Sequence, residues 1–342
     1  MRSGKMTCIS RFIGAALGVA LMGIAGTSCE RIYDDLEPCP HGVSLRFVYD
    51  YNMEFADAFP KKVDCLTVLV YDAKGTHVAT HTVAGAELQD EHFRMNLDLE
   101  EGDYSFVAYG GMACERRSFD FGTLPRPGAR LDELTVALDR DCLTNPDRKR
   151  LHDLYWGTLA LRTADLYQEG VVKMMKNTNN IRIVLQQQHG EPVDDKDFLF
   201  EIHDDNTLFS GVDNDLIAAG PVTYTPWITG QASTGVIIVG DKAETAEAVV
   251  AFAELSVSRL MTENSSKLLV KRRSDGKTII DFPLNRYLLL LRSAHYDMDD
   301  QEFLDRQSEW TLFFFLDSGN AWIDSKIVVN DWVVRIDDIE FE

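Results

Sequence analysis

The chain has 342 residues and a formal net charge of −21 at pH 7, because 55 Asp and Glu side chains outnumber 34 Lys and Arg. Nucleic acids are bound by clustered basic side chains, so a chain this acidic repels phosphate backbones and anionic lipid head groups alike. The composition therefore excludes nucleic-acid binding and any charge-driven attachment to a membrane. A chain of this length predicts two domains.

Residues 1–28 have the layout of a secretory signal peptide, with a basic start, an apolar stretch over residues 12–24 and small residues at the end. The apolar stretch is shorter than the roughly 20 residues of a membrane-spanning helix. The last residues resemble a bacterial lipoprotein signal, in which the next cysteine carries the lipid, although Gly26 stands where such signals usually have Leu. We predict lipidation of Cys29; the alternative is an ordinary secretion signal followed by an incidental cysteine.

Residues 29–41 are predicted to form the lipidated N-terminus and a flexible tether. Most of this segment is polar and acidic, and it shows neither a helical nor a strand period. The acidic cluster also resembles the export signal of surface lipoproteins in Bacteroides-like bacteria. A plain solvated linker is the alternative, and composition does not separate the two.

Short alternating segments with turn residues between them follow the tether. They predict strands and little helix, which is typical of an antiparallel sandwich. We place a linker over the charged residues 139–150, so the N-terminal sandwich spans residues 42–145 and the C-terminal one residues 151–342. The strands expected in the first sandwich are residues 43–50, 63–71, 77–83, 92–99, 104–109 and 134–138.

The second sandwich carries the same pattern with an interruption. A dense apolar run over residues 284–291, opened by Pro283, favours a short helix, and residues 299–306 favour another. Residues 204–235 are predicted to be rich in loops. The expected strands are residues 170–175, 180–187, 198–203, 248–260, 267–272, 278–282, 309–316 and 326–336. The predicted fold class is therefore mainly all-β, with one or two short helices in the second half.

Four cysteines remain in the exported chain once the signal is removed and the lipid is attached. Disulfides persist in oxidising compartments, and four cysteines allow three pairings. A Cys39–Cys142 bridge would join the two ends of the first sandwich. Cys65 and Cys114 either pair with each other, or Cys65 stays a buried thiol. Metal binding is disfavoured because no Cys-x-x-Cys or Cys-x-x-His spacing occurs.

No catalytic constellation is visible, so we expect no enzyme, no cofactor and no metal site. The acidic residues 297–300 and 213–215 have the look of calcium loops without the full EF-hand spacing. His77 and His81 would share one face of a strand, which favours a surface pair over metal ligands. Five tryptophans either pack in the core, the favoured interpretation, or form a carbohydrate platform: Trp156, Trp227, Trp310, Trp322 and Trp332.

Four segments resemble the FimB-like fimbrial anchor family of Bacteroides-type bacteria: Cys39–Phe59, Val68–Gly75, Leu154–Gly157 and Val328–Arg335. The resemblance implies two tandem transthyretin-like β-sandwiches and a non-catalytic role. It also implies attachment to the outer membrane through the lipid, fimbrial shaft subunits as partners, and a place at the base of the fibre with an effect on its length. The alternatives are a fimbrial tip or adhesin subunit and a surface glycan-binding lipoprotein. The sequence does not identify a host ligand.

A fibre base can hold its neighbour by pairing a sheet edge with a strand of the partner. Residues 327–339 alternate in part and end in an acidic tail, which guards an edge against self-pairing. They are the predicted docking strand, and an ordinary core strand is the alternative.

Overall fold

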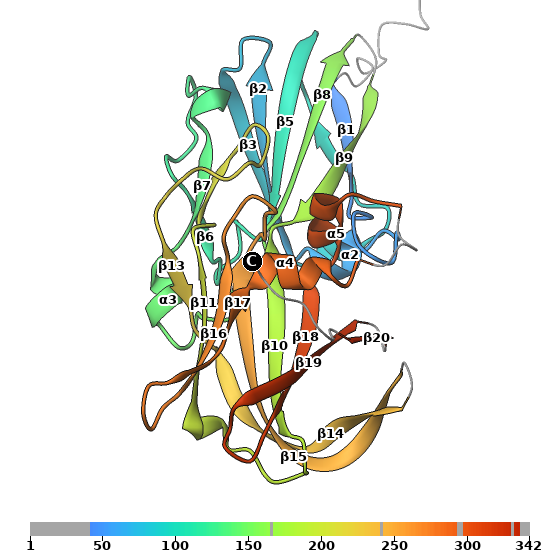
Figure 1. The fold of residues 1–342 in the computed structure, drawn as a ribbon. Coiled ribbons are helices and arrows are strands. Elements are labelled where there is room, and N and C mark those ends of the chain that lie inside the picture. Colours follow the sequence, from blue (N-terminus) through green and yellow to red (C-terminus); the bar gives the residue numbers. More distant parts are fainter. Residues whose placement is uncertain (1–41, 165–166, 240–241, 293–296, 330–331, 336–342) are drawn as a thin grey trace, which may run out of the picture.

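The computed structural model describes residues 42–164, 167–239, 242–292, 297–329 and 332–335 (Figure 1). In these ranges strands dominate, which confirms the predicted all-β fold class. The two helices expected in the second half are present as α4 (Leu284–Leu289) and α5 (Asp300–Arg306). None of the helices in these ranges combines the length and the apolar character that a membrane span needs.

A seven-stranded sheet forms the upper half of the view in Figure 1, with the order β3-β2-β5-β8-β9-β1-β4. Neighbouring strands are antiparallel except β1 and β9, which run parallel. The strands are β1 (Val43–Val48), β2 (Cys65–Asp72), β3 (His77–Ala84), β4 (Met95–Leu97), β5 (Gly102–Gly110), β8 (Tyr155–Thr163) and β9 (Gln168–Lys176).

The place of β8 and β9 corrects the expected domain assignment. The sequence pattern puts residues 155–176 in the second sandwich, but β8 pairs with β5 along its whole length and β9 pairs with β1. Without β8, the second edge of the interior strand β5 would be open, and an open edge is costly or invites aggregation. The first sheet is therefore completed by strands that come after the predicted linker.

Strands from both ends of the first sheet share one apolar core. Leu45 and Phe47 of β1 belong to the same buried cluster as Val68 of β2 and Phe106 of β5. The helix α2 (Phe59–Lys62) and the 3₁₀ turn η1 (Ala86–Gln89) add Phe59 and Leu88 to it. Burying each such side chain contributes about 1.5–3 kcal/mol, which makes this core a main source of stability for the sheet.

A six-stranded and a four-stranded sheet build the second half. The first has the order β10-β18-β19-β20-β15-β14, with an additional β10–β15 pairing, and the second has the order β13-β11-β16-β17. The strands of the six-stranded sheet are β10 (Thr178–Gln187), β14 (Ile228–Val239), β15 (Lys242–Ser258), β18 (Glu309–Leu316), β19 (Trp322–Val329) and β20 (Trp332–Arg335). Those of the four-stranded sheet are β11 (Phe198–Asp204), β13 (Val222–Tyr224), β16 (Lys267–Arg272) and β17 (Thr278–Pro283). In the six-stranded sheet, β10 and β18 run parallel.

A small sheet couples the two halves. Its order is β12-β7-β6. From the second half, β12 (Leu208–Ser210) pairs with β7 (Thr135–Leu138) of the first, and β7 pairs in turn with β6 (Phe119–Phe121). Leu69 of β2, Val136 of β7 and Ile183 of β10 lie in one continuous buried cluster. The halves therefore share a core. The remaining short helical elements are η2 (Leu131–Glu133), α3 (Asp141–Thr144) and η3 (Asp195–Asp197).

Candidate functional site

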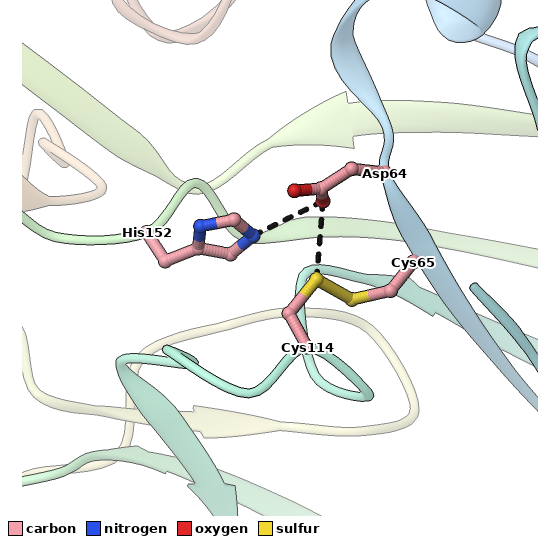
Figure 2. Close-up of a disulfide and its surroundings, with 4 residues drawn as sticks. All are labelled: Asp64, Cys65, Cys114 and His152. Carbon is pink, nitrogen blue, oxygen red and sulfur yellow. Dashed lines mark hydrogen bonds and ion pairs between the residues drawn. A yellow bond between two sulfur atoms is a disulfide. The ribbon is translucent and has the colours of Figure 1, made fainter. Parts of the chain in front are cut away.

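A disulfide joins Cys65, the first residue of β2, to Cys114 in the turn after β5, with the two Cα atoms 5.6 Å apart (Figure 2). It closes a segment with a sequence separation of 49 residues. The sequence leaves open whether Cys65 pairs with Cys114 or stays a buried thiol. The structure contains the Cys65–Cys114 disulfide. The disulfide staples the start of β2 to the turn that follows β5.

Gly111 explains why this turn lies where it does. Its backbone has a φ of +92°, a left-handed conformation that glycine adopts readily and other residues adopt at a cost. A Cβ at this position would also clash with the carbonyl oxygen of Asp153. The chain after β5 can therefore pack directly against residues 152–153, which brings Cys114 close to His152.

Asp64 and His152 complete a cluster around the disulfide. The Oδ1 of Asp64 lies 3.1 Å from His152 Nε2 and 3.1 Å from Cys114 Sγ (Figure 2). The His152 backbone N–H donates to Ser118 Oγ at 2.8 Å, which ties the segment to the first half. Next to the cluster a cavity of about 310 Å³ is lined by His152, Lys62, Arg116 and Arg150, among others. The cavity is basic although the protein as a whole is strongly acidic.

Cys142 has a different environment from the one expected. It is a free thiol, buried in α3 and part of the shared apolar core. Burial raises the pKa of this thiol. Cys142 thus forms no disulfide with any described residue, and the bridge expected between it and Cys39 stays a prediction. Cys39 and the predicted lipidation site Cys29 lie outside the described residues.

A buried polar network lies where β9 passes into β10. The side chains of Asn177, between the two strands, and Asn214 form reciprocal amide hydrogen bonds of 2.6 and 2.9 Å. Arg259 donates from Nη1 to the Asn214 carbonyl at 2.8 Å and makes two bonds of 2.7 Å to the Asp305 carboxylate. The Asn177 N–H donates to the Leu154 carbonyl, so the network runs from the start of β8 to α5. Such networks hold their elements in one arrangement only if every member is satisfied.

Arg306 adds a second contact between the halves. Its guanidinium lies 4.1 Å from the ring centre of Tyr51 and 4.6 Å from that of Phe55, both in the loop after β1. Its Nη1 also donates to the carbonyls of Asp50 and Asn52. Burial is the main cause that raises the pKa of Tyr51 to about 12. The second half thus clamps the loop that leads from β1 to α2.

The predicted docking strand does not begin as a free edge of a sheet. In the predicted segment 327–339, Ile327–Val329 belong to β19, which pairs with β18 on one side and β20 on the other. This part is therefore interior rather than a free edge, because the apolar strand β18 takes β19 as its neighbour. Residues 330–331 and 336–339 lie outside the described residues. In the described part of the chain, β14 is a terminal strand of twelve residues with β15 as its partner.

A family model for fimbrillin-A associated anchor proteins, Mfa1 and Mfa2, matches residues 36–338. The chain belongs to this family. The match confirms the resemblance to fimbrial anchors and supports a fimbrial or adhesion-related function. A comparison with curated proteins gives no match.

Three solved structures show how this anchor-family protein compares. A candidate adhesin from Bacteroides thetaiotaomicron VPI-5482 is 61% identical with a TM-score of 0.81, over 89% of this chain and 100% of that one. A candidate polysaccharide-binding protein from the same organism is 29% identical with a TM-score of 0.73, over 88% and 99%. The fimbrial anchor protein Mfa2 of Porphyromonas gingivalis, 15% identical over 87% and 99%, shares the fold with a TM-score of 0.62.

The other candidate residues have structural roles in this family member. In the first calcium candidate, Asp213 Oδ1 accepts from the Asp215 N–H at 3.2 Å. In the second, Asp299 caps α5, and Asp300 lies 3.0 Å from Arg292. His77 is buried and bonds Thr80, so it forms no surface pair with His81.

The tryptophans whose side chains are described do not gather into an exposed platform. Trp310 is buried and donates to Asn179, and Trp156 donates to the Gly211 carbonyl. Trp322 packs on Phe314, and Trp227 lies under Arg150. The side chain of Trp332 is outside the described residues. Core and junction packing, the favoured interpretation, accounts for the four.

Sequence reasoning missed both the cluster around the disulfide and the buried network. Asp64, Cys114 and His152 are far apart in the chain and form no spaced motif. Arg259 and Asp305 look like ordinary charged residues. One signal was present in the sequence. Arg259 directly follows a long apolar strand segment, so its side chain is expected to be buried, and a buried Arg requires a carboxylate partner.

Proposed function

We propose that this protein is an outer-membrane lipoprotein that anchors or assembles a fimbria at the base of the fibre, without catalysis. The observation that carries the proposal is the anchor-family match over residues 36–338, which begins just after the lipoprotein-like signal that ends at Cys29. The partners are fimbrial shaft subunits and, through the lipid, the outer membrane.

The direction of the strands supports this role. β9 starts beside β1, where Gln168 pairs with Val43, and it leads through Asn177 directly into β10. Residues 168–187, at about 3.3 Å each, would extend over roughly 66 Å. The β14–β15 hairpin lies at the far end of this path, opposite the start of β1 (Figure 1). A tether before Val43 would leave the β14 end facing away from the membrane.

In this proposal the shaft subunit adds a strand to β14. Main-chain hydrogen bonds then supply affinity, and alternate side chains supply specificity. The described exposed side chains of β14 include Ile228 and Ser233 but no Lys, Arg, Asp or Glu, so these positions lack the charge that usually blocks pairing at an edge. The shared core, the Arg259 network and the Arg306 clamp would carry the load from β14 to the tethered end.

Replacing Cys29 with Ser tests the anchoring. A single acyl chain binds membranes only marginally, so stable attachment needs the several chains of a lipidated cysteine. We expect Cys29→Ser to release the protein and its fibres into the medium, measured by fractionation and detergent-phase partition. The matched control Cys39→Ser should stay in the detergent phase. A Cys29→Ser variant that remains membrane-bound would contradict the proposal.

Charge on the strand edge tests the docking. We expect the double variant with Ile228→Lys and Ser233→Lys to fold normally and lose co-purification with the shaft subunit. The matched control carries Val78→Lys and Thr82→Lys on β3, the terminal strand of the other sheet, and should retain it. Equal capture by both variants would place the docking surface elsewhere.

A tip or adhesin subunit is the second candidate, favoured by the 61% identical structure described as a candidate adhesin. Immunogold labelling of intact fibres separates the two. Label at the cell-proximal end supports the base, and label at the free end supports the tip.

A further inference from the structure

The cluster of Asp64, Cys65, Cys114 and His152 has the chemistry of a zinc site once its disulfide is opened. We propose that reduction of the Cys65–Cys114 bridge converts this cluster into a binding site for a zinc ion. Two thiolates, an imidazole and a carboxylate are a donor set that zinc accepts in tetrahedral sites. The inference goes beyond the anchoring role and does not depend on it.

The distances fit this geometry. Bonds of about 2.0–2.3 Å to a tetrahedral zinc place the donor atoms roughly 3.3–3.8 Å apart. Asp64 Oδ1 is 3.1 Å from both His152 Nε2 and Cys114 Sγ, and all four ligand atoms lie within 4.8 Å of one another (Figure 2). Opening the bridge lets the two sulfur atoms separate, and the other donors need only small shifts.

The backbone holds the ligands close to these positions without the disulfide. The carbonyl of Asp64 accepts from the Gly85 N–H, and that of Cys65 accepts from the Gly111 N–H, each at 3.0 Å. His152 is tied to Ser118. Three of the four ligands are therefore held by hydrogen bonds that do not involve sulfur, which favours a preorganised site.

Solvent reaches the cluster from one side. The Cys65 residue is buried, whereas the Asp64 side chain is 59% exposed and that of His152 is 27% exposed. A hydrated ion can therefore approach through Asp64 and His152, with the sulfur atoms at the inner end. This arrangement leaves a route for the ion while keeping the thiolates partly desolvated.

The chemistry balances with a dithiol as the reductant. Its two thiols become a disulfide as two electrons and two protons pass to Cys65 and Cys114, which become thiols. Each thiol then loses its proton as the sulfur binds zinc, so binding releases two protons. In the reverse direction, exchange with the oxidised (disulfide) form of the dithiol takes the two electrons and two protons from solution, restores the Cys65–Cys114 bridge and expels the ion.

Cobalt serves as the spectroscopic probe for the full mature chain. The protein is reduced with a phosphine, desalted without oxygen and titrated with Co²⁺. We expect one equivalent to produce sulfur-to-cobalt charge-transfer bands and the visible bands of a tetrahedral ion, and zinc to remove both. The oxidised protein should give neither. Reduced protein without these bands would overturn the proposal.

Three variants separate a built site from incidental thiols. Cys114→Ser should lose the charge-transfer bands, and His152→Asn should weaken zinc binding by at least about 100-fold, because even outer-shell partners contribute roughly 10–100-fold. Cys142→Ser, which removes the buried thiol elsewhere, should change nothing. Bands that vanish in Cys142→Ser but persist in Cys114→Ser would refute the assignment.

Thermal unfolding provides a readout that does not depend on the bands. A ligand that binds only the folded state raises the Tm. Zinc should raise the Tm of the reduced wild type, raise that of reduced His152→Asn by less at the same zinc concentration, and leave that of the oxidised wild type unchanged. An equal rise in all three would mean adventitious binding and would overturn the proposal.

Discussion

Arg259→Met tests how strongly the buried network holds the junction. The Arg259 and Asp305 side chains are 9% and 4% exposed and share two hydrogen bonds of 2.7 Å. With methionine in place of arginine, the Asp305 carboxylate keeps the Gln301 amide at 3.0 Å and loses its counter-charge. Removing one partner of a buried pair costs about 3–5 kcal/mol, because an uncompensated charge stays buried.

Urea unfolding followed by intrinsic fluorescence measures this loss. Lys267→Met is the matched control, because Lys267 pairs with Asp281 at 2.9 Å on the surface, with side chains 51% and 46% exposed. The control should lose less than about 1 kcal/mol. Adding Asp305→Leu to Arg259→Met should recover most of the loss, since no buried charge remains. If Arg259→Met is as stable as the control, the network does not hold the junction.

Three further predictions concern the disulfide, a buried acid and the clamp. Replacing both Cys65 and Cys114 with Ala should lower the free energy of unfolding by about 4 kcal/mol for a loop of 49 residues, measured by urea unfolding, and an unchanged midpoint would contradict this. Burial raises the pKa of Asp204 from 3.8 to about 6, against an opposing hydrogen bond from Asn264, so its folded state holds the proton more tightly. Its stabilisation is fully present below pH 3.8 and is lost as the pH rises through about 6, by about 3 kcal/mol. Asp204→Asn should flatten that slope, and a slope unchanged in the variant would refute the assignment. Arg306→Ala should cost about 2 kcal/mol and speed proteolysis after Phe55, and cleavage at the wild-type rate would show that the clamp is not needed.

The local pattern of the sequence is sufficient for the elements whose stability is local. The turn between residues 272 and 278 predicts the hairpin found as β16 and β17, and the apolar run after Pro283 predicts α4. Strand β14 was missed because Gly230 and Gly235 interrupt it, and glycine weakens a strand signal. These outcomes follow from side-chain propensity and period, which any short window of sequence contains.

By itself, the sequence determined the all-β class, most strand positions, the two helices of the second half and the resemblance to the fimbrial anchor family. The tertiary structure alone decided that β8 completes the first sheet, that β12 joins β7, and that Asp64 and His152 meet at the disulfide. Periodicity tells which face of a strand is apolar, but it does not tell which distant edge will take that strand as a neighbour. That choice belongs to the whole chain, because every backbone donor and every apolar face must be satisfied at once.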